Sequence, residues 1–503
     1  MQMGANTSRR LTATIFALLV GACAQIETPP PAPLFSHDLA VRTFERGFTT
    51  IAAKYIEPVA IGGLAEEGLR GFGAIDPNLT IARDGPAIAL VGDQKEIMRW
   101  PVPQDHDPRT WADLTVKAID AGQAASDAMR AASIEEIFEA VFDGILSRLD
   151  VYSRYAGASE AGRNRAKRRG FDGIGISFRM NKRGARIVGI MPDTPAATVG
   201  LRKNDLITYV GLTPIAGWAS DAFLKRLRGP SQTSIKILVE RVDFPNPLVY
   251  DLERQHIIAP TVKVHVEDDI LVLEIKSFNN GTTRSARHAL VAARRRFGKR
   301  LKGIVLDLRG NPGGLLKQSV SIADLFLSHG KIISTRGRHP DAAQHYAADR
   351  RELAGHVPMV VLVDGKSASA SEIVAAALQD NARAIVIGTT SFGKGSVQTV
   401  IRLPNDGEMT LTWSRFITPS GKILHKHGVS PSLCTSGLTK ESMTVIPVQG
   451  QQTSQCKRER RRGDFETRLA YRILRDQALY KRIFEHQIQT ETGTQTESAR
   501  SNP

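Results

Sequence analysis

Residues 268–433 alternate between short apolar runs and amphipathic stretches, and this alternation constrains the fold more than any other feature of the chain. The apolar runs predict buried strands at 270–275, 303–307, 359–363 and 384–387. The amphipathic stretches predict helices at about 283–297, 314–329 and 369–380. Strands that alternate with helices are typical of an α/β domain, so we expect an α/β core at residues 250–433.

The N-terminal region, residues 36–165, is expected to be mainly helical. Apolar residues recur at helical spacing in three stretches, 39–44, 48–55 and 133–149. Ser133 and Glu136 have the spacing of a capping box at the start of the third stretch. Residues 76–110 are rich in Pro, Asp and Gly and only weakly periodic, so we interpret them as an insertion.

Composition excludes several classes of protein. With 42% hydrophobic and 23% charged residues in 503, the chain has a globular composition and is neither disordered nor collagen-like. It has no run of 18 apolar residues, which excludes a polytopic membrane protein. The net charge of +16 would suit nucleic acid or an anionic surface. We interpret it as a basic surface and expect no nucleic-acid partner, because the N-terminus indicates export.

The N-terminus has the pattern of a targeting segment. Arg9 and Arg10 precede the apolar residues 11–20, which are too few to span a bilayer. The sequence Val-Gly-Ala-Cys that ends at Cys23 resembles a bacterial lipobox. It predicts a signal peptide at 1–22, a lipid anchor on Cys23 and a Pro-rich tether at 23–35. The protein would then sit at the periplasmic side of the bacterial envelope, attached to a membrane. Plain secretion with cleavage near Cys23 is the alternative.

For the remaining cysteines and the C-terminal extension, the sequence predicts structure but no catalytic role. Cys434 and Cys456 are candidates for a disulfide in an exported protein, and a reduced pair is the alternative. The sequence has no metal-binding motif, so neither a metal nor another cofactor is expected. Residues 434–503 should form a basic helical extension. Its stretch 457–486 is interpreted as a solvated face, with contact to acidic lipid headgroups as the alternative, and a disordered tail is expected from about 487.

Three segments of the core are candidates for chemistry. The Gly-rich turn at 307–314 follows a strand and would expose backbone N–H groups, although it could equally be a tight connection. Ser369 would begin a helix, where N–H groups favour negative charge, but Ser369 with Glu372 also fits a capping box. Lys394 stands between two glycines. A surface lysine is the ordinary interpretation, yet the glycines indicate that backbone packs closely around it.

Together these segments resemble the C-terminal processing peptidases, also called tail-specific proteases, over about residues 130–433. The sequences Ser-Ala-Ser-Glu at 369–372 and Phe-Gly-Lys-Gly-Ser-Val-Gln at 392–398 carry the resemblance. It implies that Ser369 is the nucleophile, Lys394 its general base, and Gln398 the residue that positions the lysine amine. It also implies a core related in fold to the crotonase and Clp-protease superfamily.

The resemblance implies further site residues. The N–H groups of Ala370 and Gly313 would form the oxyanion hole, and Glu372 would support the site. Residues 171–242 are similar to a PDZ domain, with predicted strands at 171–178, 186–191 and 234–241. The loop Gly173, Ile174, Gly175 and Ile176 would offer N–H groups to the carboxylate of a substrate tail. The implied partners are proteins with unstructured apolar C-terminal tails, with an adaptor or a homo-oligomer as further candidates.

Physical chemistry agrees with these roles. A serine hydroxyl is a poor nucleophile until a base takes its proton. A free lysine has a pKa near ~10.4, which burial must lower by roughly 2–3 units for the lysine to act as a base near neutral pH. Gln398 is neutral and would not oppose this, whereas an ionised Glu372 beside the amine would. We therefore expect Glu372 on the capping side of Ser369.

The chain departs from the family pattern at two places. Leu-Asp-Val-Tyr-Ser at 149–153 replaces the usual Leu-Asp-Pro-His-Ser, and Gly-Val-Ser-Pro-Ser at 428–432 replaces Gly-x-x-Pro-Asp. We expect both changes to leave the positions of Ser369, Lys394 and Gln398 untouched.

Three other functions compete with this interpretation. The sequence 388–395 is one residue from a P-loop, but it lacks the Mg²⁺-binding hydroxyl and precedes a predicted strand. Ser391 and Lys394 match the Ser-x-x-Lys of penicillin-binding enzymes, whose partner motifs are missing from the chain. The third alternative is a non-catalytic periplasmic PDZ adaptor that binds peptide tails without cutting them.

Overall fold

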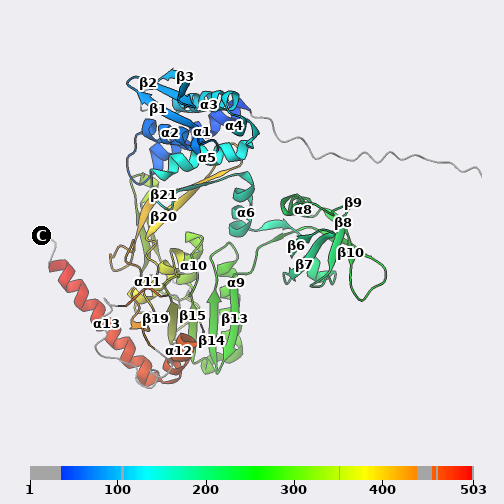
Figure 1. Cartoon of the computed structure of the whole chain (residues 1–503). Helices are drawn as coiled ribbons and strands as arrows, with labels where there is room; N and C mark the ends of the chain where they lie inside the picture. Colours follow the sequence, from blue (N-terminus) through cyan, green and yellow to red (C-terminus); the bar gives the residue numbers. More distant parts are fainter. Residues whose placement is uncertain (1–35, 104–106, 350–351, 439–455, 460–462, 501–503) are drawn as a thin grey trace, which may run out of the picture.

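A computed structural model describes residues 36–103, 107–349, 352–438, 456–459 and 463–500 (Figure 1). The predicted signal peptide at 1–22, the lipidation site Cys23 and the tether at 23–35 lie outside these residues. Within the described parts of the chain, every helix is too short or too polar to cross a bilayer.

The core is built on a six-stranded sheet whose strands come from the predicted α/β region. The spatial order is β13 (Val262–Glu267), β14 (Ile270–Ile275), β15 (Gly303–Asp307), β18 (Met359–Val363), β19 (Ile385–Gly388) and β22 (Leu433–Cys434). β13 is antiparallel to β14, and the other neighbours are parallel. The continuous apolar runs of β15 and β18 are buried along their whole length, as expected of strands covered on both faces.

Helices cover both faces of this sheet. α9 (Thr282–Phe297), α10 (Leu316–Asp324) and α11 (Ala370–Asp380) pack on one face with Leu273 and Leu306. α12 (Phe465–Arg475) packs on the other face with Val272 and Val305. α10 is shorter than the predicted helix 314–329. It begins only at Leu316, because Gly313 and Gly314 adopt the positive φ angles of a tight turn.

A second sheet links the core to the N-terminal region. It has the order β17 (Gln344–Ala347), β16 (Lys331–Arg336), β21 (Glu408–Ile417) and β20 (Ser396–Arg402), and the short β4 (Arg154–Ala156) pairs with β21. The β20–β21 hairpin runs from the core towards the N-terminal helices (Figure 1). Leu403 and Met409 of this hairpin are buried in the same hydrophobic cluster as Phe142 of the N-terminal region.

The N-terminal region contains the expected helices and an unexpected sheet. The helices are α1 (His37–Lys54), α2 (Ile61–Arg70), α3 (Pro108–Ala125), α4 (Asp127–Ala131) and α5 (Ile134–Ser147). Ser133 and Glu136 form the predicted capping box of α5. The weakly periodic insertion folds into an antiparallel sheet of β1 (Leu79–Asp84), β2 (Ala87–Gly92) and β3 (Lys95–Pro101). Sequence analysis missed this sheet because β3 is mostly exposed and so lacks a clear apolar alternation.

The PDZ-like part has a sheet of its own, in which five strands lie side by side. Its order is β11 (Leu248–Glu253), β10 (Ser234–Glu240), β8 (Leu206–Val210), β7 (Gly184–Ile190) and β6 (Ile176–Asn181), with α7 (Pro195–Thr198) and α8 (Ser220–Leu227). β11 lies beyond the predicted end at 242 and overlaps the predicted core. It pairs with β10 along six residues, so the sheet of this part extends past residue 242.

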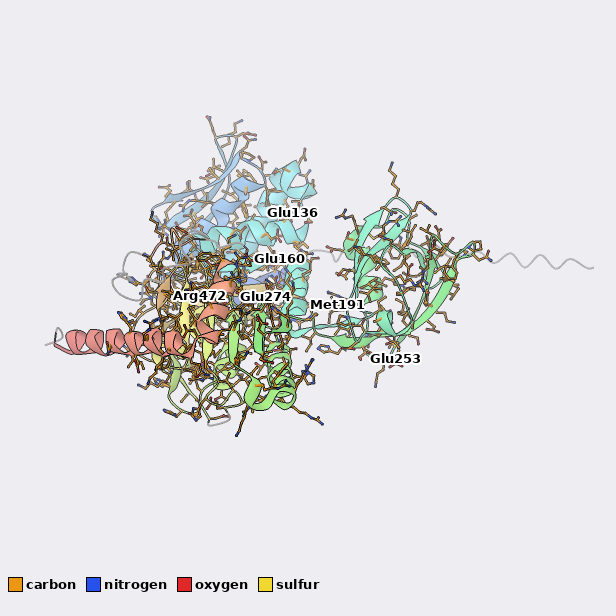
Figure 2. The ribbon with its side chains drawn as sticks, turned by 90° about the horizontal axis from the view of Figure 1, so that it is seen from below. Glu136, Glu160, Met191, Glu253, Glu274 and Arg472 are labelled. Carbon is orange, nitrogen blue, oxygen red and sulfur yellow. A yellow bond between two sulfur atoms is a disulfide. The ribbon has the colours of Figure 1, made fainter. Side chains whose placement is uncertain are left out.

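A helix and a two-stranded ribbon connect the PDZ-like part to the core. α6 (Ala158–Arg169) leads into a two-stranded ribbon of β5 (Phe171–Gly173) and β12 (Gln255–Ile257). Figures 1 and 2 show the PDZ-like strands to one side of the core, beyond this ribbon, and α13 (Gln477–Arg500) on the opposite side. Arg163 of α6 and Asp221 of α8 form an ion pair across the junction.

The C-terminal extension differs from its prediction in two ways. The stretch 457–486 is not simply a solvated face, because α12 buries Leu469, Ile473 and Leu474 against the core sheet. α13 continues to Arg500, where a disordered tail was expected from 487. A disulfide joins Cys434 to Cys456, which favours the oxidised alternative for this pair.

Candidate active site

Ser369 lies at the start of α11, directly after the loop that follows β18. Its φ angle is +56° and its ψ angle −112°, a conformation that is strained for a residue with a side chain. Two contacts hold the backbone there. The Ser369 N–H donates to Glu372 Oε2 at 2.7 Å, and its carbonyl accepts from the N–H of Ile373 at 3.0 Å. A strained serine at a helix N-terminus matches the predicted position of a nucleophile.

Glu372 brings the two predicted catalytic loops together. Its fully buried carboxylate accepts four hydrogen bonds. Oε2 accepts from the backbone N–H groups of Ser369 at 2.7 Å and Lys394 at 2.9 Å. Oε1 accepts from the Ser391 hydroxyl at 2.5 Å and the Gly393 N–H at 2.6 Å. The backbones of Ser369 and Lys394 therefore meet at a single oxygen atom.

The expected capping contact of Glu372 with the Ser369 backbone is present. The carboxylate also binds the loop of Lys394, although through backbone amides and not through the lysine amine. Burial raises the pKa of Glu372, and its hydrogen bonds with Ser391 and the three amides partly offset that rise.

The Lys394 amine faces Tyr152. Lys394 Nζ lies 4.8 Å from the centre of the Tyr152 ring, and the lysine is half-buried. Burial lowers the pKa of Lys394, and the positive charge of Arg154 lowers it further. Asp150 and Glu372 act in the opposite direction but do not reverse the shift. A lowered lysine pKa is what a general base requires.

The glycines on either side of Lys394 allow neighbouring backbone to pack closely against its loop. A Cβ atom on Gly395 would lie 2.0 Å from the backbone nitrogen of His425. Gly393 has a φ angle of +85°, and a Cβ atom there would meet the backbone of Lys426 at 3.0 Å. The predicted close packing of backbone around Lys394 is thus confirmed.

Sequence analysis missed the part that residues 150–154 play. The Tyr152 ring faces the lysine amine and the charge of Arg154 acts on its pKa, so the departure at 149–153 lies at the site. The Asp150 carboxylate shapes this segment by accepting from the Tyr152 N–H at 2.8 Å and from the Thr412 hydroxyl at 3.0 Å. The family pattern at these positions was a signal, but the sequence does not show that this segment reaches Lys394.

Gln398 lies on β20 near the site but does not bond to the lysine amine. Its side-chain Nε2 donates to Ser396 Oγ at 2.8 Å and to Thr412 Oγ1 at 3.2 Å. Among the residues that the structure describes, no hydrogen bond joins the Gln398 and Lys394 side chains. The Thr412 hydroxyl in turn donates to the Asp150 carboxylate, so Gln398 is connected to Asp150 through Thr412.

The Gly-rich turn lies against Ser369, as its predicted role in an oxyanion hole requires. Gly313 has a φ angle of +103°, and a Cβ atom there would lie 3.0 Å from both the Ala370 nitrogen and the Ser369 Cβ. Its N–H donates to Asn311 Oδ1 at 2.8 Å, so this amide already has a partner. Ala370 is the first residue of α11, where an N–H has no acceptor within the helix.

Asn311 is a structural residue of the site that sequence analysis overlooked. Its side chain is fully buried and donates to the carbonyl of Ile275 at 2.8 Å. Its own carbonyl accepts from the Ala368 N–H and the Ser371 hydroxyl. Asn311 therefore fastens the Gly-rich turn to the loop of the nucleophile.

The structure argues against the two competing motifs. The residues after Lys394 form strand β20, whereas a P-loop lysine begins a helix. Ser391 is fully buried, and its hydroxyl is engaged with Glu372 and with the N–H of Val429 at 2.7 Å. It is not available as the nucleophile of a penicillin-binding enzyme.

The predicted peptide-binding loop precedes the edge strand of the PDZ-like sheet. Ile174 is buried, and Gly175 has a φ angle of +87°, with Thr194 so close that a Cβ atom would clash. The loop leads into β6, which has a free edge in the strand order. Phe178 of β6 contacts Phe223 of α8 with ring centres 4.6 Å apart. An edge strand beside a helix is where a peptide can add as a further strand.

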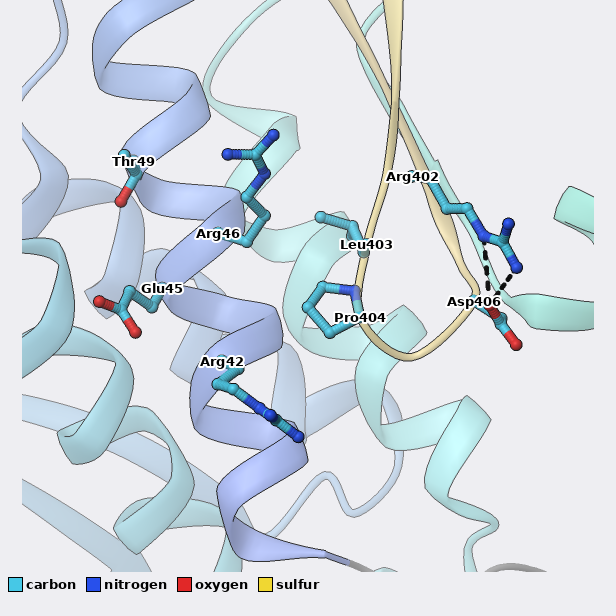
Figure 3. Close-up of a pocket in the computed structure, with 8 residues that line it drawn as sticks. All are labelled: Arg42, Glu45, Arg46, Thr49, Arg402, Leu403, Pro404 and Asp406. Atoms are coloured by element: carbon cyan, nitrogen blue, oxygen red, sulfur yellow. Dashed lines mark hydrogen bonds and ion pairs between the residues drawn. The ribbon is translucent and has the colours of Figure 1, made fainter.

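A cleft of about 680 Å³ lies elsewhere, between α1 and the β20–β21 hairpin (Figure 3). It is lined by Arg42, Glu45, Arg46, Thr49, Arg402, Leu403, Pro404 and Asp406. Most of its charges are paired within the protein: Arg402 with Asp406, Arg42 with Asp38, and Glu45 with Arg109. None of the predicted site residues lines this cleft.

Comparison with known proteins decides the family. A model described as Peptidase family S41 matches residues 269–434, and a PDZ domain model matches residues 163–240. The Carboxy-terminal-processing protease of Bartonella bacilliformis is 39% identical over 301 residues, which cover 59% of this chain and 69% of that relative. The chain belongs to peptidase family S41. The resemblance that the motifs indicated is confirmed, and this S41 chain is a serine-type peptidase with a PDZ domain.

The chain is also similar to a second relative and to a solved structure. The Probable CtpA-like serine protease of Staphylococcus aureus is 32% identical over 329 residues, which cover 64% of this chain and 64% of that relative. The solved structure of the photosystem II D1 C-terminal processing protease is 23% identical, with a TM-score of 0.36. It covers 73% of this chain and 92% of that one.

Proposed function

We propose that the chain is an endopeptidase in which Ser369 is the nucleophile and Lys394 the general base. The observation that carries this proposal is the shared Glu372 oxygen, which binds the backbone amides of both residues. The lowered pKa of Lys394 supports the role of base, because more of the amine is neutral near physiological pH.

The proposed reaction needs no cofactor. Neutral Lys394 takes the proton from the Ser369 hydroxyl as its oxygen attacks the carbonyl carbon of the peptide bond. The negative charge that develops on the carbonyl oxygen is stabilised by the Ala370 N–H at the start of α11. Gly313 becomes a second donor only when its N–H releases Asn311 Oδ1 and binds the substrate oxygen instead. Lys394 then gives its proton to the leaving amine. In the second half of the reaction, Lys394 takes a proton from a water molecule as that water attacks the acyl-enzyme. The proton then returns to the Ser369 oxygen as the product acid leaves.

The proposed substrates are exported proteins with apolar, unstructured C-terminal tails. The tail would add to the free edge of β6, with its carboxylate at the loop of residues 173–176. Ile176, Phe178 and Met180 of β6 are half-buried and pack against the core of the PDZ-like domain, which gives a tail an apolar neighbour.

We also propose a cellular location for the protein and a fold type for its core. The N-terminal pattern that ends at Cys23 supports a lipid anchor at the periplasmic side of a bacterial membrane. The parallel strands β14, β15, β18 and β19 are followed by site-bearing loops and helices, which supports a core of the crotonase and Clp-protease type.

Two substitutions test the proposed function. Ser369→Ala and Lys394→Ala should each lower the turnover of a protein with an apolar C-terminal tail by at least about a thousandfold. Binding of the tail should persist, because β6 is untouched. The measurement is the intact mass of the substrate over time, with tail affinity measured in parallel. Turnover near the wild-type rate in either variant contradicts these roles. Unchanged substrate with the wild type itself would favour the PDZ adaptor.

A further inference from the structure

Residues 456–459 form an extended segment of the C-terminal extension that crosses both catalytic loops on the outside of the core. One atom of this segment, the carbonyl oxygen of Glu459, accepts two hydrogen bonds. The first comes from the N–H of Gly365, in the loop before Ser369, at 2.7 Å. The second comes from the hydroxyl of Thr389, in the loop before Lys394, at 2.8 Å. This outer carbonyl joins the same two loops that Glu372 joins from within.

Arg458 fixes the loop of the general base more directly. Its guanidinium donates to the carbonyl of Ser391 at 3.0 Å, to that of His427 at 2.9 Å and to that of Lys426. The N–H of Lys426 in turn donates to the carbonyl of Gly393 at 2.8 Å. Arg458 therefore ties the base loop to the backbone that packs against its glycines. Ser391 is held from both sides, through its hydroxyl by Glu372 and through its carbonyl by Arg458.

The segment is fastened at both of its ends. Cys456 is bonded to Cys434 of β22, the strand that pairs with β19 at the edge of the core sheet. Glu459 accepts from the hydroxyl of Ser436 at 2.8 Å. Thr390 adds two bonds between these ends, from its hydroxyl to the Cys456 carbonyl at 2.6 Å and from its N–H to the Lys457 carbonyl at 3.2 Å. The disulfide thus places Arg458 over the base loop.

We propose that the disulfide-fastened segment 456–459 is a positioning element of the active site, with Arg458 as its positioning residue. The proposal rests on the proposed function of Ser369 and Lys394. These two residues follow different strands, β18 and β19, so contacts between their loops must set the geometry of the pair. Small displacements of catalytic groups are costly, since a misplacement of ~1 Å can lower a rate about a hundredfold.

Substitution of Arg458 by glutamine is the first test. Arg458→Gln should lower kcat at least about tenfold and leave KM for a tail-bearing substrate unchanged, because tail binding lies on β6. The rise of kcat with pH should also move to higher pH, since a looser base loop admits water to the Lys394 amine. The charged and titratable groups around that amine, Tyr152, Asp150, Arg154 and Glu372, remain in place.

The matched control is Arg42→Gln, which removes an exposed arginine of α1 whose ion pair within the described part of the chain is with Asp38, one helical turn away. It should leave kcat, KM and the pH profile as in the wild type. An unchanged kcat in Arg458→Gln overturns the proposal. A lower kcat with an unmoved pH profile also overturns it, because that result marks a merely structural role. If the wild type has no more activity than Ser369→Ala, the proposed function itself has failed.

The disulfide provides a second, independent test on the folded wild type. A dithiol transfers two electrons and two protons to the Cys434–Cys456 bond, which gives two thiols, and is itself oxidised to a cyclic disulfide. This treatment should lower kcat to the same extent as Arg458→Gln. The double variant Cys434→Ser with Cys456→Ser should start at the lower rate and not respond to the dithiol. Full activity after complete reduction, shown by a gain of two titratable thiols per chain, overturns the role of the disulfide.

Discussion

Glu372 satisfies four donors with two oxygen atoms, and glutamine cannot do the same. Replacing one oxygen with an NH₂ group places a donor against the donors of Ser391 and Gly393 or of Ser369 and Lys394. We expect Glu372→Gln to lower kcat/KM about a hundredfold, because the two loops lose their common anchor. It should also reduce the free energy of unfolding by about 1–3 kcal/mol. Peptide cleavage and urea unfolding measure the two effects.

Glu136→Gln is the matched control, since Glu136 is also the third residue of a helix and accepts from its capping residue, Ser133. It lies in α5, away from Ser369. Glutamine at this position can still accept from the Ser133 N–H, so only a small change in the free energy of unfolding is expected, with kcat/KM unchanged. Equal losses of activity in the two variants would contradict the anchoring role of Glu372.

The pH dependence follows from the environment of Lys394. The lysine acts as a base when deprotonated, so activity should rise as pH rises through its pKa. Burial, then Arg154, lower that pKa, which moves the rise to lower pH than for an ordinary lysine. Arg154→Gln removes a positive charge that disfavours the ammonium form. The pKa of Lys394 should therefore increase, and the rise in kcat should move to higher pH.

A pH–kcat profile of Arg154→Gln beside the wild type measures this shift. Arg130→Gln is the control, because Arg130 is exposed on α4 and pairs with Asp127 within one turn. Its profile should superimpose on that of the wild type. A shift of the Arg154→Gln profile to lower pH would mean that Arg154 acts on Lys394 by something other than its charge.

At the scale of elements, α12 is the clearest departure from the sequence-based expectation. Leu474 is 2% exposed and packs on Gly303 of β15. Leu474→Ala should lower the free energy of unfolding by about 2–5 kcal/mol, as expected for a cavity in a core. Arg468→Ala, at a half-exposed position of the same helix where the arginine pairs with Asp464, should change it by less than about 1 kcal/mol. Equal small effects would restore the interpretation of α12 as a solvated face.

The strands of the core could be predicted and the N-terminal sheet could not. β14, β15 and β18 have the predicted bounds, because a strand buried on both faces needs an unbroken apolar run. β3 is exposed along much of its length, so burial imposes no such pattern on it. The failure at α12 has a similar cause. The helix follows the basic run 457–462 and has three arginines among its eleven residues, so the stretch is basic overall although one face of the helix is apolar.

At the scale of the whole molecule, the PDZ-like part is joined to the core by α6 and the β5–β12 ribbon. Tail binding and bond cleavage should therefore respond to separate substitutions. Phe178→Ala should raise KM for a tail-bearing protein about tenfold, because it removes an apolar contact on β6. Its kcat should stay within about twofold, and a short peptide without the tail should be cleaved at the wild-type rate.

Steady-state kinetics with the two substrates measures this separation. Val249→Ala serves as the control, since Val249 is exposed on β11 at the other edge of the same sheet. It should leave both constants unchanged. A lower kcat on both substrates for Phe178→Ala would show that the PDZ-like part acts on the active site itself.

The sequence by itself determined the α/β core, the position of Ser369 at a helix start and the close packing around Lys394. These features are local, since a buried strand, a capping residue and a glycine each leave a pattern within a few residues. Only the tertiary structure decided that Glu372 joins both loops, that Tyr152 faces the lysine and that Arg458 binds the carbonyl of Ser391 in the lysine loop. These contacts join residues 22 to over 200 positions apart, and a chain carries no local pattern for partners that only folding brings together.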